Sequence, residues 1–135
     1  MKYKEILAYT AGIIDGEGHI AILNKPDCRS RKVQVGVTNT NEWLCQWLKM
    51  QFGGRVFTWK PYQKNWKPAY RWTLEFKRAS DFLKLALPYL NIKRAHAEIA
   101  IAYQERRIMG KRTDNQKVLD EADRILIANL NKRGL

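Results

Sequence analysis

The sequence predicts a mixed α+β domain built on one antiparallel sheet. Three observations lead to this class. Alternating apolar and polar residues over 32–38 indicate a strand that is buried on one face only. Segments with apolar residues at helical spacing precede and follow two predicted hairpins, and glycine, proline and asparagine turn signals separate them. The resulting order is helix, strand, strand, helix, strand, strand, helix, followed by C-terminal helices, which is an α+β arrangement.

The first half of the chain is predicted to form a helix, a hairpin and a second helix. Gly16 and Gly18 are expected to end the first helix, because glycine adopts C-cap backbone angles without strain. Asn41 is expected to cap the second helix. The expected ranges are 4–15 and 42–52 for the helices, and 19–23 and 32–38 for the strands, with Val33, Val35 and Val37 on one face.

The second half is predicted to add another hairpin and three helices. The final helix has apolar residues at the spacing of one helix face, namely Val118, Ala122, Ile125 and Leu126. The expected ranges are 55–60 and 70–76 for the strands, Ser80 to just before Pro88 for a short helix, 93–109 for a longer one and about 115–130 for the last. We expect one domain over 1–135, with a core of about 3–105 and a helical extension over about 106–135.

The charge of the chain indicates a polyanionic partner. Its 25 Lys and Arg residues against 13 Asp and Glu give a formal charge of +12, which favours nucleic acid; the alternative is a solvated basic surface. No apolar run approaches the ~18–20 residues of a membrane span, so no membrane partner is expected. The N-terminus shows no secretory signal. Cys28 and Cys45 lack metal-ligand spacing and are interpreted as reduced thiols, so we expect a reducing intracellular compartment, cytoplasm, nucleoid or organelle, and no secretion.

Small residues line one face of the first predicted helix. Ala8, Ala11, Gly12 and Asp15 follow one another at three- and four-residue spacing, which lets another backbone approach closely. From this pattern alone, the neighbour is either a strand of the same chain or a second helix.

Two acids lie at the C-terminal end of the same helix. The helix dipole disfavours carboxylates there by ~0.3–1 kcal/mol each, and no lysine or arginine is within three residues of Asp15 or Glu17. A divalent cation would remove this penalty, and Mg²⁺ prefers oxygen ligands. The structural alternative is that Asp15 is a buried cap and Glu17 is solvated.

Residues 10–18 resemble the LAGLIDADG signature. The segment begins at Thr10, continues through Ile13, Ile14 and Asp15, and ends with Gly16, Glu17 and Gly18, where Glu17 stands in place of the last Asp of the signature. The order of helices and strands resembles the family fold over about 3–105. The resemblance implies an α-β-β-α-β-β-α homing-endonuclease-like domain with a saddle-shaped antiparallel sheet. It also implies that signature helices pack in pairs. Because one motif occurs here, a homodimer is expected, with an interface through Ala8, Ala11, Gly12 and Asp15.

The resemblance also implies roles for site residues. Glu17 matches the acid that binds the divalent metal, expected to be Mg²⁺, and the carbonyl of Gly16 matches the backbone ligand. Asp15 matches the earlier acid, which is structural in the family. Lys93, in the segment 88–93, resembles a lysine of the catalytic pocket; the alternative is a solvated lysine. Asn39 lies where the family often has a polar pocket residue.

The polar face of the sheet is expected to read DNA. Arginine and glutamine can contact base edges, whereas lysine mainly contacts phosphates. The candidate residues are Lys25, Arg29, Arg31, Lys32, Gln34, Arg55 and Arg71. Four aromatic residues, Trp59, Tyr62, Trp66 and Tyr70, are interpreted as core and hairpin packing rather than base stacking. His19 and His96 lack ligand-spaced partners and are interpreted as structural.

The resulting hypothesis is a site-specific, metal-dependent double-strand DNA endonuclease. The resemblance implies a staggered cut across the minor groove of a long, partly palindromic target, and a gene carried in an intron or mobile element. Two alternatives on the same fold are an intron maturase that binds RNA without cleaving DNA, and a DNA-binding regulator that has lost catalysis.

Overall fold

The computed structural model describes residues 1–23, 31–63, 65–107 and 113–132. The elements follow the predicted order. They are the helices α1 (Tyr3–Glu17), α2 (Glu42–Phe52), α3 (Phe76–Ala86), α4 (Arg94–Arg106) and α5 (Asp114–Leu130), the strands β1 (Gly18–Leu23), β2 (Lys32–Asn39), β3 (Arg55–Trp59) and β4 (Ala69–Glu75), and a short 3₁₀ turn at Leu87–Tyr89. Within these ranges, no helix combines the length and apolar character needed to span a membrane.

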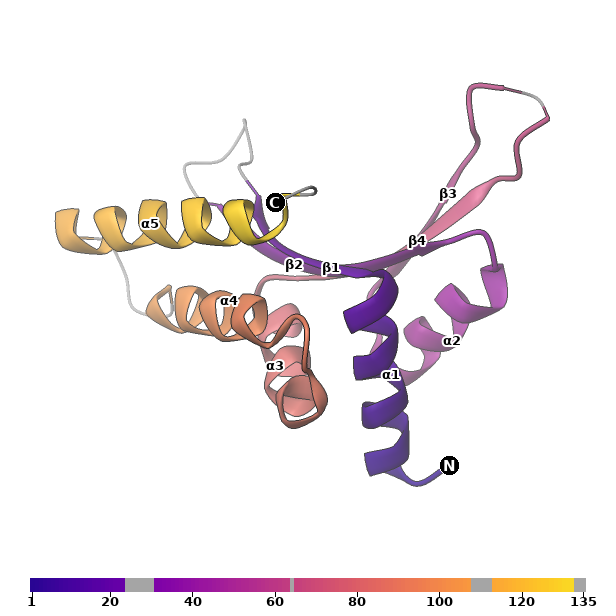
Figure 1. Ribbon diagram of the computed structural model, residues 1–135, viewed down its shortest axis with the longest axis horizontal. Helices are drawn as coiled ribbons and strands as arrows, with labels where there is room; N and C mark the ends of the chain where they lie inside the picture. The colour runs from indigo at the N-terminus through magenta and orange to yellow at the C-terminus, as the bar shows by residue number, and fades with distance from the viewer. Residues whose placement is uncertain (24–30, 64, 108–112, 133–135) are drawn as a thin grey trace.

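In the described part of the chain, four strands form one antiparallel sheet in the order β1-β2-β4-β3. The sheet is curved like a saddle, as predicted, and helices α1 to α4 lie on one side of it (Figure 1). The valines of β2 at positions 33, 35 and 37 point to that side and are fully buried. The other face carries no helix layer in Figure 1, so the predicted division into an apolar and a polar face is correct.

Strand register decides which side chains share the open face. Directly opposed residues of an antiparallel pair point to the same side of the sheet. Trp72 is opposite both Val37 and Val56, so these three side chains point toward the helices. The neighbouring positions therefore point to the open face, and these include Arg55, Phe57, Arg71 and Thr38.

An aromatic cluster fixes the helices to the middle of the sheet. Trp72 packs edge-on against Phe82 at 5.7 Å between ring centroids, and its Nε1 donates to the carbonyl of Gly53 at 2.8 Å. Gly53 and Gly54 both have positive φ, 78° and 95°, and a Cβ at Gly54 would lie 2.3 Å from the carbonyl oxygen of Thr73. The turn after α2 therefore requires glycine.

Three helix ends differ from the prediction. α1 continues through Gly16 and closes at Gly18, whose backbone is extended rather than left-handed. α3 begins at Phe76, directly after β4, and not at Ser80, which is buried inside the helix. Asn41 occupies the N-cap position of α2, but its side chain makes no capping hydrogen bond.

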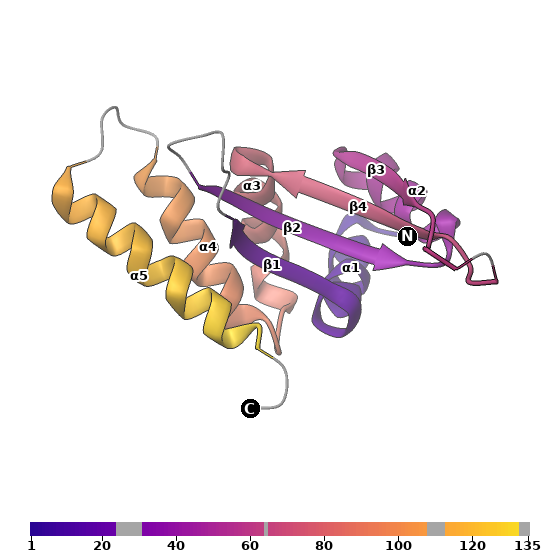
Figure 2. The same ribbon diagram turned by 90° about the horizontal axis from the view of Figure 1, so that it is seen from above.

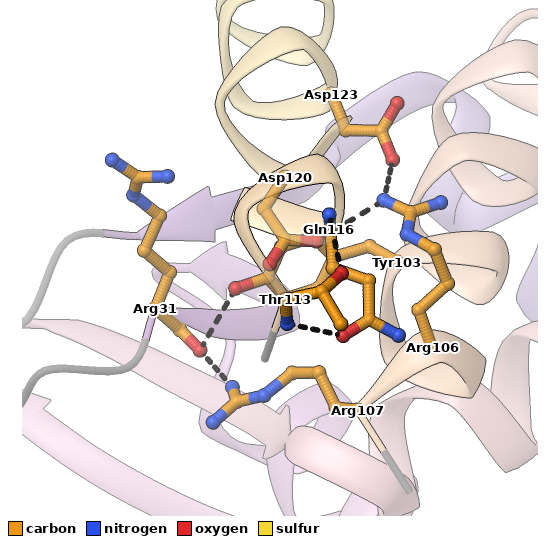
Figure 3. Close-up of polar contacts among 8 residues, drawn as sticks. All are labelled: Arg31, Tyr103, Arg106, Arg107, Thr113, Gln116, Asp120 and Asp123. Carbon is orange, nitrogen blue, oxygen red and sulfur yellow. Dashed lines mark hydrogen bonds and ion pairs between the residues drawn. The ribbon is translucent and has the colours of Figure 1, made fainter. Parts of the chain in front are cut away.

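α5 packs beside α4 and β1 through the buried Ile127 and through polar side chains (Figures 2 and 3). Arg106 of α4 is paired with Asp120 and Asp123 of α5, and Arg31 at the start of β2 is paired with Glu121. The predicted apolar face, Val118, Ala122, Ile125 and Leu126, is exposed instead. The prediction failed here because the acids on the opposite face of α5 have cationic partners on α4 and at Arg31, and these pairs fix how the helix is rotated.

Candidate functional site

Glu17 and Asn39 meet at the end of α1. The side-chain amide of Asn39 donates from Nδ2 to Oε2 of Glu17 at 2.6 Å. The other end of the same amide is fixed, because Oδ1 of Asn39 accepts the backbone N–H of Asn41 at 2.8 Å. Both groups were predicted from the sequence, and the structure brings them together: β2 ends beside the C-terminus of α1, and the turn into α2 orients the amide toward Glu17.

Asp15 and Lys93 connect the same helix end to α4. The carboxylate of Asp15 accepts the backbone N–H groups of Asn91 and Lys93, each at 2.9 Å. The ammonium group of Lys93 donates to the carbonyl oxygen of Asp15 at 3.0 Å. Asp15 therefore has the structural role that was predicted as one alternative. Lys93 thus places a cation at the negative end of the α1 dipole. The carbonyl that it contacts belongs to Asp15, two residues before Glu17 along the chain.

The donor groups here suit an open magnesium site. Glu17 and Gly16 are both exposed, and a Cβ added to Gly16 would meet no atom within 4 Å. Among the described residues, no three His, Cys, Asp or Glu side chains cluster to form a closed metal cage. Mg²⁺ does not require one, since it is usually held by one or two carboxylates together with substrate phosphates and water. Glu17 and the carbonyl of Gly16 therefore fit as the protein's share of such a site.

The exposed small residues of α1 are Ala8, Gly12 and Gly16. Nothing lies within 4 Å of a Cβ added to Gly12. One predicted interface position is wrong, because Ala11 is fully buried in the core of its own chain. Asp15 is half-buried, and its carboxylate is engaged by the segment before α4. The helix is rotated relative to the predicted stripe, because Ala11 packs under the sheet with the other buried residues of α1.

A groove of about 630 Å³ runs beside this exposed side of α1. Gly12, Glu17, Asn39, Trp43 and Leu44 are among its lining residues, so the groove continues from α1 onto α2 and reaches the candidate site.

A larger groove of about 960 Å³ lies over the part of the open face that β2, β4 and β3 form. Of the predicted DNA-binding residues, four line it: Lys32, Gln34, Arg55 and Arg71. Lys25 and Arg29 lie outside the described residues. Arg31 is the exception among those described, because its side chain pairs with Glu121 of α5 and its carbonyl accepts hydrogen bonds from Tyr103 and Arg107 (Figure 3).

Polar contacts preorganise the floor of this groove. Nε of Arg71 donates to the hydroxyl of Thr38 at 3.0 Å, and Lys32 is paired with Glu75 of β4. A ring nitrogen of His19 is 2.9 Å from Oε1 of Gln34. An amide oxygen only accepts, so His19 is the donor and the amide nitrogen of Gln34 remains as a donor group.

His19 contacts the groove residue Gln34, a contact that the sequence interpretation missed. Its ring lies over Gly36, where a Cβ would come within 2.5 Å of Cε1. Burial lowers the pKa of His19, the hydrogen bond with Gln34 raises it to a smaller degree, and the nearby charges of Arg71 and Lys93 lower it further. The sequence could have predicted its side of the sheet, because residues alternate between the two faces of a strand and His19 is adjacent to Ile20, which is buried with Ile22 on the other face.

The interpretation of the aromatic hairpin is also corrected. Trp59, Tyr62 and Trp66 are 59%, 100% and 56% exposed, so they do not pack in the core; Tyr70 is half-buried. Trp59 lies on the open face of β3, and Tyr62 and Trp66 lie in the loop after it, which rises on the side of the sheet away from helices α1 to α4 (Figure 1). Tyr70 lies on β4 and packs against the core, as predicted.

Comparisons with known proteins identify the fold. No protein-family model and no curated protein matches the sequence. Among solved structures, the homing endonuclease I-CvuI, in complex with its target in the presence of 2 mM Ca, matches with a TM-score of 0.74 at 22% identity, over 98% of this chain and 85% of that one. The archaeal intron-encoded homing endonuclease I-Vdi141I, complexed with DNA, matches with a TM-score of 0.77 at 16% identity, over 99% and 89%.

A third match differs in length. The LAGLIDADG homing endonuclease I-GzeII, in complex with a DNA target, has a TM-score of 0.63 at 15% identity; the alignment covers 96% of this chain but 45% of that one. The present chain thus corresponds to about half of I-GzeII and to most of I-CvuI.

Proposed function

Because the chain has the fold of the LAGLIDADG homing endonucleases, we propose that it is a site-specific, metal-dependent DNA endonuclease that acts as a homodimer. The observation that carries the proposal is the position of Glu17. Its exposed carboxylate is oriented by Asn39 at the end of β2, and the ammonium group of Lys93 lies at the same helix end. β2 also carries Lys32 and Gln34, which line the groove on the basic face of the sheet.

Duplex DNA is the substrate that this face favours. The major groove of B-DNA, about 12 Å wide, admits β-strands and presents a distinct pattern of donors and acceptors for each base pair. Arg71 and Gln34 have side chains suited to base edges, and Lys32 and Arg55 supply charge for phosphates. The I-CvuI and I-Vdi141I structures are themselves complexes with DNA.

Glu17, Asn39 and Lys93 have different roles in the proposed hydrolysis. Glu17 provides the negative charge that holds the metal, and Asn39 keeps that carboxylate in one orientation by donating to Oε2. Lys93 holds a positive charge beside the scissile phosphate, which offsets charge that develops during the reaction. When bound, Mg²⁺ supplies Lewis-acid stabilisation of the phosphate oxygens. One phosphodiester bond is hydrolysed in each strand.

The homodimer follows from having one such site per chain. Cutting both strands needs two sites, and the exposed side of α1 around Gly12 is not covered by other parts of the described chain, so a second α1 can pack there across a two-fold axis. The match to about half of I-GzeII supports this arrangement, since a chain of roughly double length can hold both copies of the domain.

The decisive experiment is Glu17→Gln. The substitution keeps size and removes the charge, so single-turnover cleavage of a bound target in Mg²⁺ should fall by more than about 10²–10³-fold, the usual loss for one electrostatic contact. Binding in Ca²⁺ should persist. Glu98→Gln, which neutralises an exposed carboxylate on α4, is the matched control and should cut normally. Near wild-type cleavage by the Glu17→Gln protein would contradict the proposed function.

A further inference from the structure

We propose that Phe57 and Trp59 recognise the C5-methyl groups of thymines in the target duplex. The inference rests on the proposed function and names a feature of the DNA that the groove selects. It starts from two aromatic side chains that the fold leaves 45% and 59% exposed on the open face of β3.

β3 is the edge strand on the side of the sheet away from β1. Along it, Arg55, Phe57 and Trp59 point to the open face and line the large groove. The side chain of Val56, between them, points toward the helices and is half-buried. The two rings thus stand in one row, next to an arginine, on a surface whose other contributors are largely basic or polar.

The residues opposite on β4 do not cover these rings. Arg71 faces Phe57, but Nε of Arg71 bonds to Thr38 on the far side of β4, which directs the guanidinium toward the middle of the sheet. Ala69 faces Trp59 and has only a methyl side chain, and Thr73, opposite Arg55, is 2% exposed. The two rings and Arg55 are therefore uncovered on the open face of β3, where they can reach a bound duplex.

A base-paired duplex offers one strongly apolar feature to such rings. Stacking requires an open base face, which a duplex hides, whereas the thymine methyl projects into the major groove. Arg55, in the same row as the two rings, can contact a neighbouring phosphate. Residues two apart on a strand are about 6.6–6.8 Å apart, close to two base-pair steps of about 3.4 Å. Phe57 and Trp59 should therefore contact two thymines about two base pairs apart in each half-site.

The proposed dimer partner would not cover the exposed rings of Phe57 and Trp59. The dimer proposed above packs through α1, on the helix side of the sheet, and β3 and its loop rise on the other side (Figure 1). Unpaired bases are the remaining alternative occupant, since they stack on exposed aromatic side chains of sheets. The experiment below separates paired from unpaired DNA.

The test compares two random duplex libraries, one made with thymidine and one with deoxyuridine, which differ only in the C5-methyl group. The full chain is allowed to bind each in Ca²⁺, and the bound DNA is sequenced. We expect thymine preference at two positions per half-site in the first library and its loss in the second. On isolated targets, each methyl removed should weaken binding about fourfold, which corresponds to about 0.8 kcal/mol.

Single variants assign the two positions. Phe57→Ala should abolish the thymine-over-uracil preference at one position, and Trp59→Ala at the other. Tyr62→Ala, which truncates a fully exposed ring in the loop, is the control and should keep both. Equal preferences in the two libraries, or a uracil penalty that the variants retain, would overturn the inference and leave the nuclease proposal standing. Tighter binding to single strands that depends on both rings would overturn it in favour of stacking. Failure to bind any duplex would overturn both proposals.

Discussion

Asp15 and Lys93 are joined by two hydrogen bonds, and Lys93 is the donor in both. The backbone N–H of Lys93 donates to Oδ1 of Asp15 at 2.9 Å, and the side chain of Lys93 donates to the carbonyl of Asp15 at 3.0 Å. The C-terminus of α1 and the start of α4 are thereby fixed to each other. The residue that positions the lysine is thus distinct from the carboxylate proposed to hold the metal.

Asp15→Ala should therefore lower both stability and cleavage. It leaves the backbone N–H groups of Asn91 and Lys93 without their acceptor, which costs about 1–3 kcal/mol. Asp15→Asn keeps one oxygen acceptor and should recover part of the stability. Thermal melting and single-turnover cleavage on the same preparations measure the two effects. Unchanged melting of the alanine variant would show that the contact is not maintained in solution.

Gly12→Leu should separate folding from dimerisation. No atom of the chain lies near a Cβ at this position, so the monomer should accommodate leucine, and the loss of a helical glycine should stabilise α1 by about 0.5–1 kcal/mol. The same side chain would hold two α1 helices apart. Sedimentation should show a dimer for the wild type and a folded monomer for the variant, with double-strand cleavage lost. A variant that still dimerises would place the interface elsewhere.

Glu75→Gln should tighten DNA binding at low salt. Glu75 is paired with Lys32 inside the groove, so the lysine must exchange one anion for another when it meets a phosphate. Neutralising the glutamate removes that competition and one repulsive charge. Lys32→Ala should weaken binding to all sequences alike and reduce the slope of log K against log[salt] by about 0.9. Titrations at several salt concentrations measure this. An unchanged affinity for Glu75→Gln would indicate that Lys32 does not contact DNA.

Acid should destabilise the fold as His19 and His96 become protonated. Burial is the largest cause of the lowered pKa of both His19 and His96. The unfolded chain then binds protons more readily than the folded one. The two neutral, buried histidines therefore contribute stability that is fully present above the usual histidine pKa of about 6.5. It is lost as pH falls from there through the lowered folded pKa. Urea unfolding between pH 5 and 8 checks this, and His19→Gln should flatten the dependence. A pH-independent midpoint would contradict it.

Local patterns predicted the fold well because each element carries its own signal. The valines of β2 defined one strand face, and Glu17 and Asn39 were found because a motif and a strand end marked them. Rotations about helix axes were harder to predict. Ala11 of the small stripe on α1 and the apolar face of α5 were assigned to the wrong side, because the burial of Ala11 and the ion pairs of Arg106 depend on tertiary partners that spacing does not reveal.

The position of His19 over Gly36 sets a limit for anyone who wishes to redirect this protein to a new target. A retargeting library would randomise the open-face positions of β2, and three of them, Lys32, Gln34 and Thr38, can accept new side chains without a backbone clash of this kind. Position 36 cannot, since any side chain there would come within 2.5 Å of the imidazole and 2.8 Å of the carbonyl oxygen of Trp72. Residue 36 should therefore stay glycine in such a library, because we expect variants with another residue there not to fold.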